Sequence, residues 1–358
     1  MARPQKTRSS TSSVSRKTNA SQDDKTTLSA KESCPEKQDP FGDETHAGVK
    51  YKTMAWWQAG MGYTIGQLKC RYVQIHSMAD AGDILFGSLG HRILGSAQLI
   101  FFLFAMGGHI LTFSIMMNVL TEHFTCTIAF SVLGLVVSFV LTLPRRLEDL
   151  SHISTVSFIS IIGALLTCMI GVSVSPLVPA QLPLFSPTPS VHDACLAIAN
   201  IVFAYAGHVA FFTFFSELRE INDYPKALAL LQMSEMVLYT VTAVVIYAFV
   251  GPTVTSPALN SAAKLFRRIS YGIAIPTIVI GGVVNAHVAV KSIYVRTGQG
   301  DNSMHTRSYT ARAFWAAICA VLWVFSWVIA ESIPVFNDVL GLAVSTVNAW
   351  NIILGADR

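Results

Sequence analysis

Eight long apolar stretches follow one another almost without interruption from Arg92 to Gly355. A helix needs about 17 to 25 apolar residues to cross the hydrocarbon core of a bilayer, and these stretches are of that length. Lipid offers no hydrogen-bond partner to backbone amides, so runs of this kind must cross as helices. The composition agrees, with 52% hydrophobic and 13% charged residues. The sequence therefore predicts an all-α, polytopic membrane protein.

The expected spans are separated by short polar or proline-containing loops. The last span is less apolar than the others because it contains Asn348 and Asn351. We place the eight spans at 92–119, 126–143, 153–174, 194–216, 228–250, 272–295, 311–333 and 338–354.

Residues 1–50 differ from the rest of the chain. Serine, threonine, lysine and acidic residues dominate them, and no apolar periodicity is present from which a core could be built. We predict a disordered cytosolic tail whose hydroxyls and lysines are available to regulatory kinases or to ubiquitin machinery. The alternative is an inert spacer.

Basic residues are distributed unequally between alternate loops. One set of loops carries eleven of them: Lys69, Arg71, Arg92, Arg145, Arg146, Arg219, Lys226, Lys291, Arg296, Arg307 and Arg312. The opposite set carries three, all within 251–271: Lys264, Arg267 and Arg268. Because positive loops stay in the cytosol, this bias predicts a cytosolic N-terminus. The basic residues are too dispersed for nucleic acid binding, and the expected partner is the lipid bilayer of the plasma or vacuolar membrane.

Ionisable and amide side chains inside the spans are candidates for function, because such groups are costly in lipid. His109 follows a glycine pair in the first span, and Glu235 lies about two turns inside the fifth. Asn285 and His287 follow Gly281-Gly282 in the sixth span. The alternative for His109 and His287 is a hydrogen bond between neighbouring helices.

The fourth span, NIVFAYAGHVAFFTFFSEL, is the most informative. A Gly207-His208 pair at its midpoint favours a helix that unwinds near the bilayer centre, where freed backbone groups can bind the charged ends of a ligand. Alternatively, the glycine allows close packing of a neighbouring helix and the histidine bonds to it. We find no nucleotide-binding loop, no Ser/His/Asp spacing, no HExxH and no CxxC. The sequence therefore predicts neither an enzyme nor a bound cofactor or metal.

Seven segments between residues 51 and 345 carry a resemblance to a known family. They are YKTMAWWQAG, HSMADAGDILFG, GGHILTFSIMMNVLTEH, FVLTLPRRLEDLSHISTVSFISI, NIVFAYAGHVAFFTFFSELREINDYPKALALLQ, IPTIVIGGVVNAHVAVKSIYVR and AESIPVFNDVLGL. These segments resemble the fungal neutral amino acid permeases of the amino acid/auxin permease family, within the APC superfamily. The resemblance implies transport of neutral amino acids by alternating access, coupled to a gradient of protons or sodium ions, with the proton favoured. A membrane sensor or scaffold derived from such a permease is the alternative.

The resemblance also implies a LeuT-like fold with eleven spans. The first ten form two inverted repeats of five helices, and the first and sixth helices are broken at the substrate site. The fourth span here matches the sixth helix of the family, and the sixth span matches the eighth, which helps to form the site of the coupling ion. The matched positions make Asn285 an ion-site residue, and the expected substrate contacts are Phe203, Tyr205, Ala206, Gly207 and His208.

The chain departs from the family pattern before the first long span. The segment that opens the first helix, MAWWQAGM, runs directly into GYTIGQLKCRY, which closes the second helix in the family. About 40 residues are expected between them, because two spans of about 20 residues each are involved. After Leu342 the pattern also drifts, without an eleventh span. We therefore expect a LeuT-like bundle that is incomplete at both ends, with a tail (1–50), a remnant of the first two helices (51–91) and a transporter domain (92–358).

Overall fold

The computed structural model describes most of the chain after residue 64. The described residues are 65–72, 75–145, 148–174, 190–216, 224–297, 309–333, 338–339 and 341–343. Most of them are helical, and there is no strand among them. The tail, the Gly60–Met61 junction and most of the expected eighth span lie outside the described residues.

Helices of membrane-spanning length dominate. Five are long and apolar enough to cross a bilayer: α2 (Met78–Thr121), α4 (Glu148–Val174), α7 (Tyr224–Val250), α8 (Lys264–Thr297) and α9 (Tyr309–Ser332). The shorter elements are α3 (Thr127–Thr142), α5 (Val191–Ala204), the 3-10 turns η2 (Ala206–Ala210), η4 (Gly251–Thr253) and η5 (Ala258–Ser261), and α6 (Phe211–Ser216). The shorter apolar helices at Thr127–Thr142 and Ala194–Ala204 occupy the expected second span and the first half of the fourth. The prediction of an all-α, polytopic membrane protein is confirmed.

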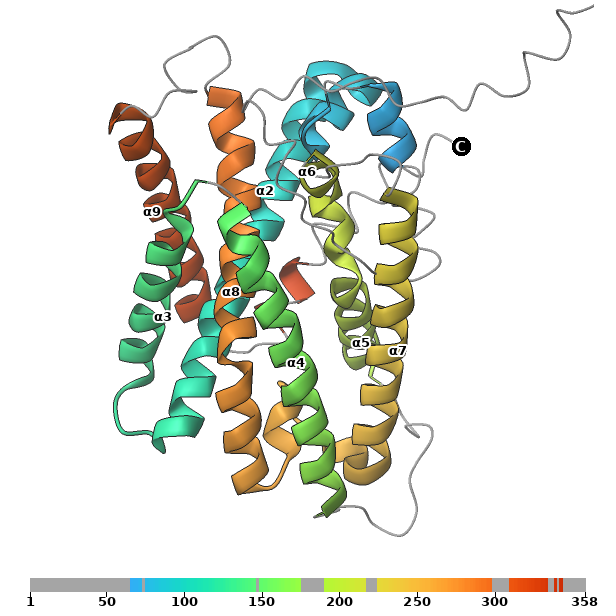
Figure 1. The fold of residues 1–358 in the computed structure, drawn as a ribbon, viewed down its shortest axis with the longest axis vertical. Coiled ribbons are helices and arrows are strands. Elements are labelled where there is room, and N and C mark those ends of the chain that lie inside the picture. The colour runs from blue at the N-terminus through green and yellow to red at the C-terminus, as the bar shows by residue number, and fades with distance from the viewer. Residues whose placement is uncertain are drawn as a thin grey trace, which may run out of the picture.

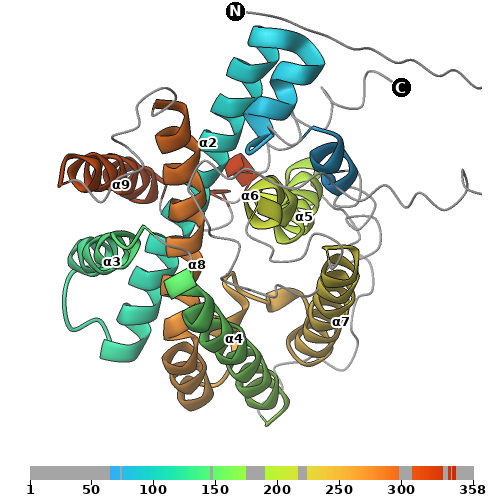
Figure 2. The same ribbon diagram turned by 45° about the horizontal axis from the view of Figure 1, so that its top comes forward.

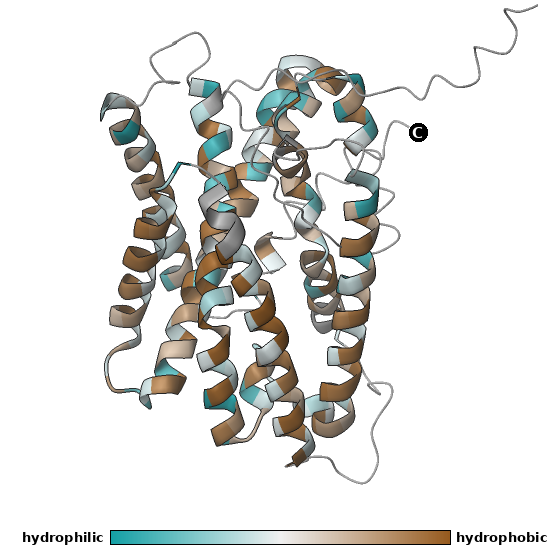
Figure 3. Cartoon of the chain, viewed as in Figure 1, coloured by the Kyte–Doolittle hydropathy of each residue, from teal (hydrophilic) through white to brown (hydrophobic). Residues whose placement is uncertain are grey.

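Helix α8 lies at the centre of the larger group of helices. It contacts α2, α3, α4 and α9, and Figures 1 and 2 show these four helices around it. Helices α5, α6 and α7 form a second group beside them (Figure 2). Apolar residues run along the middle of most helices, with hydrophilic residues concentrated towards their ends (Figure 3). This distribution is the one expected for a bundle whose outer surface faces lipid.

Helix α2 begins well before the apolar run that predicted it. Ser77 caps its N-terminus: the Ser77 hydroxyl accepts from the backbone N–H of Asp80, while the Asp80 carboxylate accepts from the N–H of Ser77. The helix is then interrupted at Gly87, whose φ of 62° only glycine adopts readily. Arg92 to Thr121 supplies the membrane-spanning part, while the capped turns before Gly87 make a separate segment outside the predicted span.

Pro276 lies inside α8 and removes one backbone donor from the middle of this helix. Hydroxyl groups join this stretch to α4. Ser160 of α4 donates to the carbonyl oxygen of Ile273 at 2.5 Å, and Thr277 donates to the carbonyl oxygen of Ser157 at 2.5 Å. The α4–α8 pair is therefore joined by polar contacts as well as by apolar packing.

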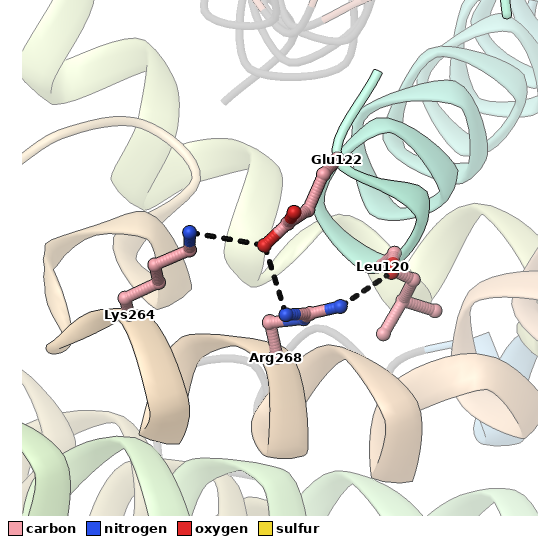
Figure 4. A network of polar contacts seen from close by, with 4 residues as sticks. All are labelled: Leu120, Glu122, Lys264 and Arg268. Atoms are coloured by element: carbon pink, nitrogen blue, oxygen red, sulfur yellow. Dashed lines mark hydrogen bonds and ion pairs between the residues drawn. The ribbon is translucent and has the colours of Figure 1, made fainter. Parts of the chain in front are cut away.

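An ion-pair cluster joins the end of α2 to the start of α8 (Figure 4). Glu122, the C-cap of α2, accepts from Lys264 at 2.9 Å and from Arg268 at 3.0 Å. Arg268 also donates to the carbonyl oxygen of Leu120 at 3.1 Å. The hydrogen bond from Lys264, aided by the positive charges of Lys264 and Arg268, holds the pKa of Glu122 below its usual value. Lys264 and Arg268 are two of the three basic residues found on the side of the membrane with few positive charges. Both are paired with a carboxylate on that same side.

Candidate functional site at the broken helix

The fourth expected span is not one continuous helix. Helix α5 ends at Ala204, and Tyr205 has non-helical torsions (φ −102°, ψ 11°). The tight turn η2 follows from Ala206 to Ala210, and α6 continues the chain from Phe211. The discontinuity that the Gly207-His208 pair predicted is therefore present at that position. Three of the five expected substrate contacts, Ala206, Gly207 and His208, lie in the turn, and Tyr205 precedes it.

The side chains of the break have different surroundings. Ala206 and His208 are buried, whereas Gly207 is exposed. The Nδ1 atom of His208 lies 3.4 Å from the carbonyl oxygen of Tyr205. Its Nε2 atom is buried and has no hydrogen-bond partner among the described residues. A buried ring nitrogen without a hydrogen-bond partner is costly, so this atom is the unsatisfied polar group of the break.

Two side chains from other helices hold the carbonyl oxygens on either side of the break. The Gln98 amide of α2 donates to the carbonyl oxygen of Val209 at 3.0 Å. The Tyr239 hydroxyl of α7 donates to the carbonyl oxygen of Ala204 at 3.4 Å, and its ring lies 5.6 Å from the ring of Tyr205. Sequence reasoning missed both anchors. Each is a polar residue within an apolar span, which is the signal that could have identified it.

Apolar packing fixes the break against α2. The ring of Phe203 lies 6.0 Å from that of Phe101, and Phe203 packs against the main apolar cluster of the bundle. Ala206 belongs to the same cluster, together with Met106 of α2 and Ala286 of α8. The broken segment is thus supported by the central helices, on which its position depends.

His109 serves the packing of α2 on α8. Its Nδ1 lies 3.0 Å from the carbonyl oxygen of Ile278, and its ring rests against Gly281 and Gly282. A Cβ atom at Gly281 would come within 2.5 Å of the His109 Cε1. This geometry favours the alternative of an interhelical hydrogen bond, and it explains why the glycine pair of α8 is needed.

Asn285 and His287 do not share one site. Two residues apart on α8, their side chains leave the helix on nearly opposite sides. His287 is fully buried with its ring 5.7 Å from that of Trp315 on α9, whereas Asn285 is half-buried one turn beyond Gly281. Of the two, Asn285 is therefore the residue on the side of α8 that meets α2.

Glu235 lies on α7, one turn before Tyr239, with its Oε2 atom buried and without a hydrogen-bond partner among the described residues. It is therefore the acidic side chain nearest in sequence to Tyr239, which holds the carbonyl oxygen before the break. Within the described part of the chain, no cluster of three or more His, Cys, Asp or Glu residues could hold a metal ion.

Comparison with known proteins agrees with a transport fold. Residues 63–354 match the model of the family described as transmembrane amino acid transporter protein. The chain is 32% identical over 290 residues to the N amino acid transport system protein of Neurospora crassa, covering 78% of this chain and 62% of that protein. It is 25% identical over 291 residues to a transmembrane transporter of Fusarium pseudograminearum, covering 79% of this chain and 61% of that relative.

The chain therefore spans 62% or less of the length of these relatives. The family consists of transporters, in agreement with the prediction of a transport protein that is not an enzyme, and the named relatives are fungal. The family match covers most of the chain, including the broken helix and the central helices that support it. The chain belongs to the transmembrane amino acid transporter family.

Proposed function

We propose that the chain is a secondary transporter of small neutral amino acids, driven by an ion gradient, with the proton as coupling ion. The observation that carries this proposal is the interrupted helix α5–η2–α6, within a chain of the amino acid transporter family. The name of the Neurospora crassa relative, an N amino acid transport system protein, supports amino acids as the substrates.

A zwitterionic substrate must leave water to enter such a site, and it does so only where polar groups replace its hydration. Backbone groups freed by a broken helix can meet its carboxylate and ammonium groups. In this proposal the backbone of Tyr205–His208 and the free ring nitrogen of His208 are the partners, and Phe203 borders the apolar side chain. Asn285 would be a ligand only if the coupling ion were sodium, because its amide oxygen can accept a cation but the amide does not take up a proton.

Uptake by a host that lacks its own amino acid permeases tests the proposal. The expected result is accumulation of labelled alanine that collapses when a protonophore dissipates the gradient. Accumulation that persists without any gradient would contradict coupling. No uptake, with the chain at normal density on the membrane, would favour the sensor or scaffold.

The sensor or scaffold is retained as a second candidate because one observation favours it. The direct junction of Gly60 to Met61 leaves no room for the first broken helix that the family resemblance implies. In this alternative, the transmembrane domain 92–358 anchors the tail 1–50, which kinases or ubiquitin machinery can reach. The remnant 51–91 connects the tail to the domain.

The proposed orientation places the N-terminus in the cytosol of a plasma or vacuolar membrane. Insertions of a glycosylation reporter near Asn260 and near Ser303 test it, since the loop charges assign these two sites to opposite faces. We expect glycosylation near Asn260 alone. Labelling of both sites, or of neither, would contradict the assignment.

A further inference from the structure

We propose that Glu235 on α7 is the group that carries the coupling proton, and that Tyr239 transmits its ionisation to the broken helix. This inference rests on the proposed transport function and assigns one of its steps to a residue. It concerns the contact between α7 and the end of α5, where Figures 1 and 2 show the two helices on the same side of the bundle.

Glu235 lies near the middle of α7, a helix of 27 residues. It shares one face with Gln232, Tyr239 and Thr242, because residues three or four apart lie above one another on a helix. Its Oε2 atom is buried without a partner, and it forms no ion pair with any described lysine, arginine or histidine. An ionised carboxylate in this position would carry an uncompensated charge inside the membrane. A stable arrangement needs either a proton or a new hydrogen-bond donor.

Tyr239, one turn further along α7, is the hydrogen-bond donor on this face that also contacts the broken helix. A phenolic hydroxyl has a single hydrogen to donate. In the structure that hydrogen goes to the carbonyl oxygen of Ala204, at 3.4 Å, directly before the break. If Glu235 loses its proton, the carboxylate becomes the stronger acceptor for this hydroxyl, because hydrogen bonds to charged groups are stronger than those to neutral ones. The Ala204 carbonyl is then released.

The exchange of partners links proton binding to the substrate site. With a proton on Glu235, the Tyr239 hydroxyl holds Ala204 and the ring stays packed on Tyr205. Without that proton, the hydroxyl turns towards Glu235 and the end of α5 is freed. The proton binds to the carboxylate from one side of the membrane and leaves it to the other side. Apart from this O–H bond, no covalent bond is made or broken.

Tyr205 faces this point, and the titratable groups that α6 and α4 bring to α7 lie towards its two ends. Across from Tyr239, α5 brings Tyr205. Helix α6 packs on the N-terminal end of α7, where Phe215 meets Tyr224. Helix α4 packs against Ile246 and Val250 at the other end, where it brings the Cys168 thiol. Tyr239 is therefore the nearest of these groups to Glu235 along α7.

The test measures alanine binding to the purified full chain between pH 5 and pH 8, from the thermal stabilisation that alanine gives. If one proton is linked to binding, the affinity rises by up to about tenfold for each unit that the pH falls. Glu235→Gln imitates the protonated acid, so its affinity is expected to be independent of pH. Glu331→Gln is the matched control, because this carboxylate of α9 accepts from Ser131 and lies outside the proposed link. It should keep the pH dependence.

Infrared spectroscopy distinguishes proton binding by Glu235 from the effect of that proton on the broken helix. The wild type is expected to show the band of a protonated carboxyl group that Glu235→Gln lacks. Tyr239→Phe should keep that band and lose the pH dependence of binding. Glu235→Asp keeps an acidic group, so it should retain both the infrared band and the pH dependence of binding. It is the control that a substitution at this position does not by itself misfold the protein. Alanine binding with the same pH dependence in Glu235→Gln as in the wild type overturns this inference and leaves the proposed function standing, whereas no binding by the wild type at any pH overturns both.

Discussion

Gly207 is the glycine of the break. It sits in the turn between two buried residues, Ala206 and His208, and it is itself exposed. A leucine there raises the helix propensity of the turn and opposes the interruption. We expect Gly207→Leu to abolish amino acid binding while expression stays near that of the wild type. Binding measured at wild-type affinity in this variant would mean that the glycine serves helix packing alone.

His208 is expected to act by hydrogen bonding. Its Nε2 atom is buried and has no partner within the described residues, so an incoming polar group can use it. Glutamine keeps a hydrogen-bonding group in roughly the same place, whereas leucine removes it. The loss of a hydrogen bond to a charged group costs about 1.5 to 3 kcal/mol, so His208→Leu should weaken binding at least tenfold more than His208→Gln. Equal affinities of the two variants would exclude this role.

Two glycines of α8 provide a matched pair for testing the packing of α2. A Cβ atom at Gly281 would lie 2.5 Å from His109 Cε1, whereas one at Gly272 would meet nothing within 4 Å. We expect Gly281→Ala to destabilise the protein by about 1–3 kcal/mol through overpacking. Gly272→Ala should be neutral or stabilising by up to about 1 kcal/mol, because alanine favours helices. Thermal unfolding in detergent measures both, and a Gly281→Ala variant as stable as Gly272→Ala would refute the close contact.

At the scale of the elements, the apolar run lengths predicted most helices to within a few residues. Examples are α7, expected at 228–250 and found at Tyr224–Val250, and α9, expected at 311–333 and found at Tyr309–Ser332. The runs could not predict where α2 starts, because Ser77 and Asp80 cap a polar stretch that hydropathy does not register. Hydropathy measures the cost of burying side chains in lipid. A helix cap instead satisfies backbone N–H groups at the end of a helix, outside the lipid, so hydropathy does not detect it.

The site was predictable only in its local part. The Gly-His pair located the break because glycine weakens a helix wherever it occurs. Gln98 could not be assigned to it, since its hydrogen bond to Val209 joins residues 111 apart in the sequence. Contacts of this kind depend on how the helices are packed, and no local pattern specifies that packing. The same holds for Tyr239 and Ala204.

The α2–α8 cluster gives a pH-dependent prediction. The pKa of Glu122 is lowered from its ordinary value of 4.5, chiefly by the hydrogen bond from Lys264. A lowered pKa in the folded state means that the carboxylate contributes stability above about pH 4.5 and loses it as the pH falls through the lower value. Glu122→Gln should therefore reduce the melting temperature at pH 7, and this effect should shrink progressively as the pH falls below 4.5.

Salt provides the control for that prediction. The pairs of Glu122 are exposed, so added salt screens them, and the difference between wild type and Glu122→Gln at pH 7 should shrink at 1 M salt. A difference that stays the same as the pH falls and in high salt would show that the substitution acts through the cap of α2 and not through the ion pairs.

At the scale of the whole molecule, the two helix groups are supported unequally. Helix α8 is surrounded by four helices, whereas α7 contacts α4 and exposes large apolar side chains such as Val237 (60%) and Val244 (62%). Such exposure is the normal state of a helix in lipid. Helix α7, which carries the Tyr239 anchor of the break, is thus less enclosed by other helices than α8.

The last prediction concerns the junction of Gly60 and Met61. If transport requires two broken helices, the chain as written offers an amino acid only the partners in 203–208, and unpaired charged ends cost about 1–3 kcal/mol for each lost hydrogen bond. We expect about 10- to 100-fold weaker alanine uptake than in a variant that carries the corresponding segment of the Neurospora crassa relative, about 40 residues, between Gly60 and Met61. A hydrophilic insert of equal length is the control and should not restore alanine uptake.

Sequencing the transcript across the codons for Gly60 and Met61 shows which form the cell makes. Robust uptake by the chain as written, equal to that of the restored variant, would show that the first broken helix is dispensable.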